Sequence, residues 1–180
     1  MAIMRNQDIF YGNFDTFELA CSGQKLKNSE VKENAFSSVR WKNRQRAFLD
    51  MSQKGNSPRF STLPSFLAKH KDIDLILDMG GGSGWIFNLL QTGTKKNLTY
   101  WNFEISEMCD EFSKEFSNID KVHFVDSWES NLILNEISLV YSNSTMQYFS
   151  DDNFFKNFKK INPPKYLLFD DFIVTDTKSY

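Results

Sequence analysis

Short apolar runs alternate with helix-like stretches in the second part of the chain, from about residue 72 onward. The run Ile73–Met79 (IDLILDM) is apolar on both faces in its later half, which is typical of a buried parallel strand. Similar runs predict more strands, and apolar residues at helical spacing predict helices between them. The predicted strands are Ile73–Met79, Leu98–Phe103, Val122–Val125, Ile137–Tyr141 and Tyr166–Phe169, and the predicted helices are Gly84–Thr92, Glu107–Phe116 and Asn153–Lys160. This alternation predicts βαβ units and an α/β fold with a doubly wound, mostly parallel sheet.

Residues 1 to about 70 follow a different pattern, which is polar, rich in lysine and asparagine, and without a strand-like apolar run. An approximate helical spacing predicts a helix between about 35 and 52, and its positions are Phe36, Val39, Arg40, Asn43, Ala47, Phe48 and Met51. Turn residues follow at 54–58, and Ser61–Lys69 reads as a second, short helix. We therefore expect a helical N-terminal extension or cap, residues 1–70, and a core of residues 71–180.

The composition is that of an ordinary globular protein. Of the 180 residues, 41% are hydrophobic and 24% are charged, and the formal net charge is −2. This balance excludes a disordered chain and a strongly basic nucleic-acid-binding domain. Phenylalanine is in excess at 18 residues, which we interpret as a phenylalanine-rich core.

The chain carries no sign of export, membrane insertion or metal binding. No segment approaches the roughly 18 apolar residues of a membrane span, and the first residues lack the apolar stretch of a signal peptide. Cys21 and Cys109 form no CxxC pair and have no histidine at metal-binding spacing. We expect a cytoplasmic protein with free thiols, without a metal, and without a membrane or nucleic-acid partner.

Four of the eight glycines fall between Gly80 and Gly84, where the first predicted strand meets a helix. Glycine lets a backbone turn sharply and approach a ligand, and a helix N-terminus offers free N–H groups. A nucleotide-like ligand is therefore predicted at this turn. The dinucleotide pattern GxGxxG from Gly80 would need glycine at Trp85, and no GxxxxGK[ST] phosphate loop is present.

The spacing of Asp78, Gly80, Gly82 and Gly84 resembles motif I of the class I S-adenosylmethionine (SAM) methyltransferases. The resemblance implies a Rossmann-like core, with Asp78, Gly80, Gly81, Gly82 and Gly84 around bound SAM. It also implies that Glu104, at the end of the second strand, binds both ribose hydroxyls, for which a carboxylate has two acceptor oxygens. Two alternatives stay open for Glu104. It could bind the ribose of NAD, which uses an acid similarly, or it could be an acid that the dipole favours at a helix N-terminus.

Two later segments extend the resemblance. Asp126 and Ser127 follow the third strand and match the adenine-binding segment. Trp128 either lies against the base or has a core or surface role. After the fourth strand, the segment 140–149 and the opening residues 10–14 are similar to a subgroup of methyltransferases associated with polysaccharide biosynthesis. That similarity implies that Asn143 lines the methyl-donor pocket, and that Ser144, Gln147 and Tyr148 line the acceptor pocket.

Methyl transfer depends mainly on aligning the nucleophile with the methyl carbon and sulfur, and a base is needed only where the nucleophile loses a proton. Candidates near the carboxyl ends of the strands are Tyr148, Asp170 and Asp171, and no convincing catalytic base stands out. His70 and His123 lie at the opposite ends of strands. Members of the resembled class have two further strands, for which the roughly ten residues after the fifth strand leave no room. We therefore expect a shortened core whose exposed fifth-strand edge, near Phe169 and Phe172, is open to homodimer formation.

The resulting hypothesis is a SAM-dependent methyltransferase that acts on a small-molecule or saccharide acceptor, with O-methylation favoured. The alternatives are a non-catalytic SAM- or nucleoside-binding module and an NAD-dependent oxidoreductase. A basic cluster, formed by Arg40, Lys42, Arg44 and Arg46, is either a solvated helix face or a contact for an anionic acceptor.

Overall fold

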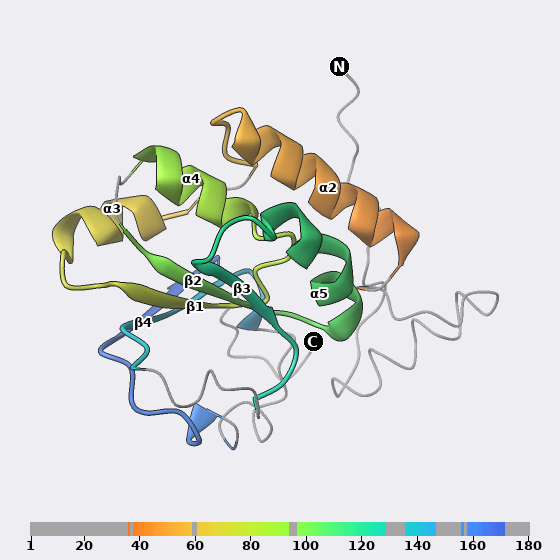
Figure 1. Cartoon of the computed structure of the whole chain (residues 1–180). Coiled ribbons are helices and arrows are strands. Elements are labelled where there is room, and N and C mark those ends of the chain that lie inside the picture. Colours follow the sequence, from red (N-terminus) through yellow and green to blue (C-terminus); the bar gives the residue numbers. More distant parts are fainter. Residues whose placement is uncertain are drawn as a thin grey trace, which may run out of the picture.

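The core of the protein is a five-stranded, entirely parallel sheet, seen in a computed structural model (Figure 1). The structure describes residues 36, 38–58, 61–93, 97–128, 136–146, 156 and 158–171. The strands are β1 (Leu75–Met79), β2 (Thr99–Phe103), β3 (Val122–Val125), β4 (Leu139–Asn143) and β5 (Tyr166–Asp170). They lie in the order β3-β2-β1-β4-β5, and each neighbouring pair is parallel. The predicted α/β fold with a doubly wound parallel sheet is confirmed.

The described helices lie together over one face of this sheet (Figure 1). They are α2 (Val39–Gln53), α3 (Leu63–Lys69), α4 (Trp85–Gly93), α5 (Ser106–Phe112) and the 3-10 turn η1 (Ser113–Phe116). The sequence predicted each of these segments as helical, with boundaries that differ by a few residues. The helix expected at residues 153–160 lies largely outside the described residues.

Two hydrophobic clusters cover the two faces of the sheet. Alternate residues of a strand point to opposite faces, so Ile76 joins the cluster under the helices while Leu77 joins the other. The helix-side cluster also contains Leu49 of α2 and Leu63 and Leu67 of α3. Because α2 and α3 share this cluster with the strands, they form part of the main core. A separate capping function for residues 1–70 stays a prediction.

Helix α2 begins at an N-cap serine and buries a face that its apolar pattern does not mark. Ser38 Oγ accepts the Trp41 N–H at 3.3 Å, as expected for an N-cap. The buried positions are Gln45, Leu49 and Ser52. Val39 and Met51, which belong to the predicted helical spacing, are 67% and 42% exposed. The helix was predicted, but its buried face is set by packing on α4 and by a polar contact described below.

The order of the strands places a crevice beside the glycine-rich turn. The chain moves from β1 outward to β2 and β3 and then returns to the other side of β1 as β4. The loops after β1 and β4 therefore diverge, and ligands of open α/β sheets bind in the crevice that this creates. Gly80–Gly84 follow β1 and Ser144 follows β4, so both lie at this crevice.

Strand β5 ends the described sheet on one side. Its Leu167 and Phe169 side chains are 51% and 38% exposed. The expected homodimer through this edge stays a prediction, and Phe172 lies outside the described residues. Within the described part of the chain, no helix combines the length and apolar character needed to cross a membrane.

Candidate functional site

The glycine-rich loop after β1 has a backbone that side chains would obstruct. Gly80 and Gly82 have φ angles of +72° and +60°, in the left-handed region that favours glycine. A Cβ on Gly80 would lie 2.1 Å from Thr145 Cγ2, and a Cβ on Gly82 would lie 2.2 Å from Gln45 Oε1. Both positions are therefore restricted to glycine by backbone conformation and by space.

Two N–H groups of the glycine-rich turn, just before α4, are bound by side chains from elsewhere in the chain. The Gly82 N–H donates to Glu104 Oε1 at 2.9 Å, and the Ser83 N–H donates to Gln45 Oε1 at 3.1 Å. Gln45 is buried and reaches the loop from α2. These two donors, which lie in the turn that leads into α4, are thus occupied by groups of the protein.

Glu104 lies directly after β2, beside the glycine loop. Its second carboxylate oxygen accepts the Ile105 N–H at 3.0 Å, where α5 begins. Glu104 thus lies just before the N-terminus of α5, and the alternatives for its role stay open. Burial raises the pKa of Glu104, and the two backbone N–H groups oppose that rise. Each oxygen keeps a second lone pair, so binding of ribose hydroxyls stays a compatible prediction.

A buried polar cluster lies beneath the loop on the helix-facing side of the sheet. Asp78 is 2% exposed, and its carboxylate accepts a hydrogen bond from the Tyr100 hydroxyl. Asn102, the neighbour of Asp78 on β2, donates through Nδ2 to the Gly82 carbonyl at 2.9 Å. Burial is the main cause that raises the pKa of Asp78, to about 7. In this cluster, Asn102 binds the loop directly, and Asp78 lies beside it.

The predicted adenine-binding segment lies at the carboxyl end of β3. Asp126 and Ser127 are exposed, and Asp126 accepts a hydrogen bond from Ser106 Oγ at 2.6 Å. Trp128 packs on Phe103 with ring centroids 4.8 Å apart, in the cluster on the face away from the helices. Trp128 is partly buried there, and its contact with the base stays a prediction. Adenine contacts of Asp126 and Ser127 stay predictions.

The carboxyl ends of β4 and β5 are joined by a pair of unusual residues. Ser144 and Asp171 have φ angles of +58° and +52°, which few residues other than glycine adopt. Ser144 Oγ donates to Asp171 Oδ2, and it also bonds to Asn143 Oδ1 at 3.2 Å. Thr145 Oγ1 then donates to the Gly80 carbonyl at 3.2 Å, which connects this pair to the glycine loop. Gln147 and Tyr148 lie outside the described residues.

Asp170 anchors the N-terminus of α3. It is buried, and it accepts hydrogen bonds from the Thr62 N–H at 2.8 Å, from the Thr62 hydroxyl and from the Tyr141 hydroxyl at 3.0 Å. These three donors give it a structural role. Asp171 is exposed at the same strand end, and is therefore the more accessible of the two predicted base candidates.

The histidines make aromatic contacts away from the loop. His70 packs against Phe66 and Tyr166, with ring centroids 4.2 and 4.7 Å apart, and His123 packs on Trp101 at 4.4 Å. Both residues lie near the amino ends of strands, as the sequence indicated.

Part of the basic cluster on α2 is engaged within the molecule. Arg44 lies over the Trp41 and Phe48 rings at 5.5 and 5.3 Å, and Arg46 forms an ion pair with Glu111 of α5. These contacts favour packing on the protein's own surface over contact with an anionic acceptor.

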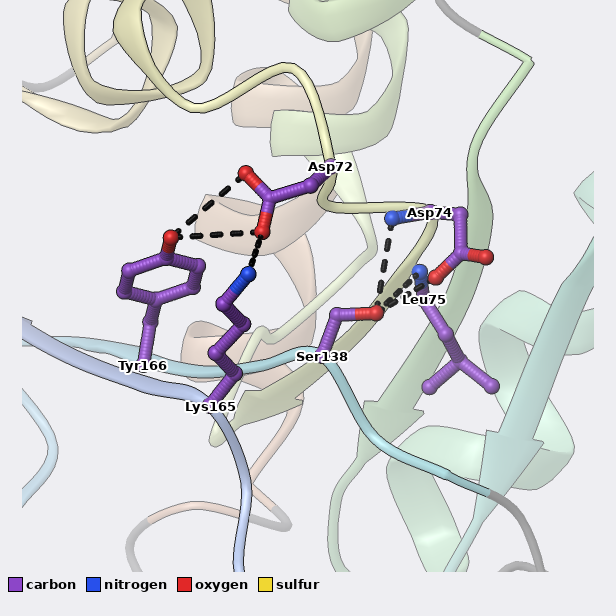
Figure 2. A network of polar contacts seen from close by, with 6 residues as sticks. All are labelled: Asp72, Asp74, Leu75, Ser138, Lys165 and Tyr166. Carbon is purple, nitrogen blue, oxygen red and sulfur yellow. Dashed lines mark hydrogen bonds and ion pairs between the residues drawn. The ribbon is translucent and has the colours of Figure 1, made fainter.

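A cavity of about 440 Å³ lies at the opposite, amino-terminal edge of the strands. Figure 2 shows the polar network beside it, in which Asp72 binds Lys165 and the Tyr166 hydroxyl while Ser138 binds Asp74. Asp72, Asp74 and Lys165 are exposed, so these charges are paired in contact with solvent. Because this cavity is at the far edge from the glycine loop, it does not belong to the predicted site.

Comparison with known proteins supports the fold assignment. No protein-family model and no curated protein matches the sequence. Among solved structures, the chain is similar to the mitomycin 7-O-methyltransferase MmcR, with a TM-score of 0.50 and 12% identity over 88% of this chain and 46% of that one. A candidate SAM-dependent methyltransferase from Methanococcus maripaludis gives a TM-score of 0.49 and 16% identity, over 67% of this chain and 58% of that one.

The similarity defines the class of fold. The chain has a Rossmann-like core with a five-stranded parallel sheet, and this core is similar in fold to that of the methyltransferase MmcR. It spans 58% of the Methanococcus protein and 46% of MmcR, so it corresponds to about half of each. At identities of this order the similarity concerns the fold, and none of these comparisons supports the polysaccharide-associated subgroup.

Proposed function

We propose that the protein binds SAM at the loop after β1 and transfers the methyl group to a hydroxyl of a small-molecule or saccharide acceptor. The fold supports a ligand at the crevice between the β1 and β4 loops. The predicted contacts with the loop, the ribose and the adenine all come from residues at the carboxyl ends of β1, β2 and β3.

The observation that carries this proposal is the occupation of two N–H groups of the glycine-rich turn that precedes α4. A dinucleotide site of this fold holds a pyrophosphate against the glycine-rich turn and the helix N-terminus behind it. Here the Gly82 and Ser83 N–H groups are bound by Glu104 and Gln45, and the Glu104 carboxylate would repel a phosphate. These contacts favour an adenosyl ligand without phosphates, such as SAM, over NAD.

The proposed acceptor side is the Ser144–Asp171 pair. It lies at the ends of β4 and β5 and is connected to the glycine loop through Thr145. Backbone conformations as rare as these tend to occur at functional sites. If the acceptor is a hydroxyl group, Asp171 is the described carboxylate best placed to accept its proton, because Asp170 is buried and bound by three donors.

A non-catalytic SAM- or nucleoside-binding module is the second candidate. Its support is that Asp170, one of the predicted bases, serves as an anchor for α3, which leaves Asp171 as the described candidate. The two functions differ in turnover and share the same ligand.

Transfer of a labelled methyl group from SAM to a panel of hydroxyl-bearing small molecules and sugars tests the catalytic proposal. We expect transfer to at least one acceptor, and we expect D171N to lower kcat at least tenfold through loss of the base. D110N removes an exposed carboxylate of α5 and is the matched control, with kcat unchanged. SAM binding without transfer to any acceptor would instead support the binding module.

A further inference from the structure

Asp78 and Asn102 lie opposite each other on β1 and β2, and each carries a buried acceptor oxygen without a donor beneath the glycine loop. Their side chains lie close together, because Asp78 Oδ2, which accepts the Tyr100 hydroxyl, and Asn102 Oδ1 are each 2.5 Å from the point where Gly81 would carry a Cβ. Oδ1 of Asp78 and Oδ1 of Asn102 are both shielded from solvent, and neither has a hydrogen-bond partner in the described part of the chain. Buried acceptors are almost always paired, so this cluster lacks at least one donor.

Turning over the Asn102 amide does not supply that donor. In the observed orientation, Nδ2 donates to the Gly82 carbonyl at 2.9 Å. The reverse orientation would offer Nδ2 to Asp78, but it would set Asn102 Oδ1 against the Gly82 carbonyl oxygen. Either orientation therefore sets the Asn102 carbonyl oxygen against another acceptor, which is the Asp78 carboxylate in one case and the Gly82 carbonyl in the other. A proton on the Asp78 carboxyl removes this conflict in the observed orientation.

The charged groups around Asp78 favour its neutral form. Tyr100 on β2, Tyr141 on β4 and Glu104 after β2 are the titratable groups that interact with it. Tyr100 donates one hydrogen bond, whereas burial and the negative charge of Glu104 raise the Asp78 pKa to about 7. Glu104 accepts two backbone N–H groups, which stabilise its own charge. Two neighbouring carboxyl groups in such different surroundings tend to divide into one acid and one carboxylate.

We propose that Asp78 holds a proton near neutral pH and donates it to Asn102 Oδ1, and that it thereby acts as a positioning residue for the glycine loop. With its Oδ1 held by Asp78, the Asn102 amide is fixed in the orientation that donates to the Gly82 carbonyl, and the Gly82 N–H donates to Glu104. A chain of hydrogen bonds then runs from Asp78 to the proposed ribose-binding carboxylate. The consequence for the ligand rests on the proposed function, whereas the proton on Asp78 does not.

The proton makes stability depend on pH in a defined direction. An ordinary Asp side chain has a pKa of 3.8, while that of Asp78 in the folded protein is about 7. The folded state therefore holds a proton that the unfolded chain releases in this window. The stabilisation is complete below about pH 4, is lost as the pH rises towards 7, and changes little above that value.

Urea unfolding of the full chain between pH 4.5 and 8.5 tests the proposal with D78N, D78A and D110N. Asn at position 78 can donate to Asn102 and accept from Tyr100, as the neutral acid does. We expect the unfolding midpoint of D78N to rise relative to wild type as the pH increases, while D110N stays parallel to wild type. D78A, which can do neither, should be less stable than D78N at every pH.

A ¹³C NMR titration of the wild-type Asp78 carboxyl gives a second reading that requires no variant. We expect the carboxyl to be protonated at pH 6. An ionised carboxyl at pH 6, or a constant difference between D78N and wild type across the pH range, would overturn the proposal, because a buried water would then supply the donors.

The effect on the ligand is read separately by SAM calorimetry. We expect D78A to lose at least tenfold in affinity and D78N to lose less. If wild type does not bind SAM, the proposed function fails, while the unfolding and NMR measurements still decide the proton on Asp78. Equal losses in D78N and D78A would contradict the positioning role.

Discussion

Gly80 and Gly55 share a left-handed backbone but have very different surroundings. Gly55 has a φ of +75° with nothing within 4 Å of an added Cβ, whereas Gly80 has a φ of +72° with Thr145 in the way. Gly55 therefore isolates the cost of the left-handed backbone, whereas Gly80 combines that cost with a steric conflict, because only Gly80 is crowded.

The variant G80A is expected to lose more stability than G55A. An alanine in the left-handed region costs about 1–2 kcal/mol at either position. The clash with Thr145 adds about 1–3 kcal/mol at Gly80 alone. Urea unfolding of both variants measures this difference, and equal losses would mean that Thr145 moves aside freely.

Gln45 is the residue that connects the N-terminal helix to the loop. Removing its side chain in Q45A leaves the buried Ser83 N–H without an acceptor, which should lower the free energy of unfolding by about 1–3 kcal/mol. N43A, at an exposed position of the same helix, is the control and should change stability little. A Q45A protein as stable as N43A would show that the contact does not hold α2 on the loop.

At the residue scale, the sequence predicted the glycine loop and the carboxyl-end positions of Glu104 and Asp126. Regular spacing marks these positions, because strand ends and tight turns have local signals. The contacts of Gln45 and Asn102 were missed. Asn102 is 20 positions from its partner Gly82, and Gln45 is 38 positions from its partner Ser83. A polar residue on a helix or strand carries no local signal of a partner so far along the chain.

At the element scale, α3 depends on a side chain from the far end of the described sheet. Its N-cap residue, Thr62, makes no capping bond of its own, and Asp170 of β5 accepts both the Thr62 N–H and the Thr62 hydroxyl. Helices this short need tertiary contacts to persist. Asp170 therefore ties α3 to the sheet.

We expect D170N to lower the free energy of unfolding by about 1–3 kcal/mol, because the amide accepts fewer bonds and leaves a buried donor unpaired. D171N, at the exposed neighbouring position, should have a smaller effect on stability. Unfolding curves for the two variants check this. If D170N is as stable as wild type but abolishes methyl transfer, Asp170 rather than Asp171 is the base.

Most elements could be predicted because their patterns are local. The predicted strand at 122–125 coincides with β3. The strand at 137–141 is shifted by two residues from β4, and the other three differ from the observed strands by one or two residues at one end. The buried face of α2 was not predictable, because Gln45 and Ser52 are buried by polar contacts that hydrophobic spacing does not register.

At the scale of the whole molecule, the strand order places the candidate site. The loops after β1 and β4 diverge, and side chains from three segments converge on the glycine loop, which are Gln45 of α2, Asn102 and Glu104 at the end of β2, and Thr145 after β4. The alternation of strands and helices predicted the parallel sheet and the loop at the carboxyl end of its first strand, but not the contacts of Gln45 and Asn102. The acceptor was not predictable, because the acceptor-side segment has no pattern tied to one substrate.

Calorimetry of the wild-type protein with SAM, S-adenosylhomocysteine and NAD tests the central claim most directly. The occupied Gly82 and Ser83 N–H groups predict that SAM and S-adenosylhomocysteine bind at one site and displace each other, and that NAD does not compete. Saturable binding of NAD in the absence of SAM binding would contradict the account.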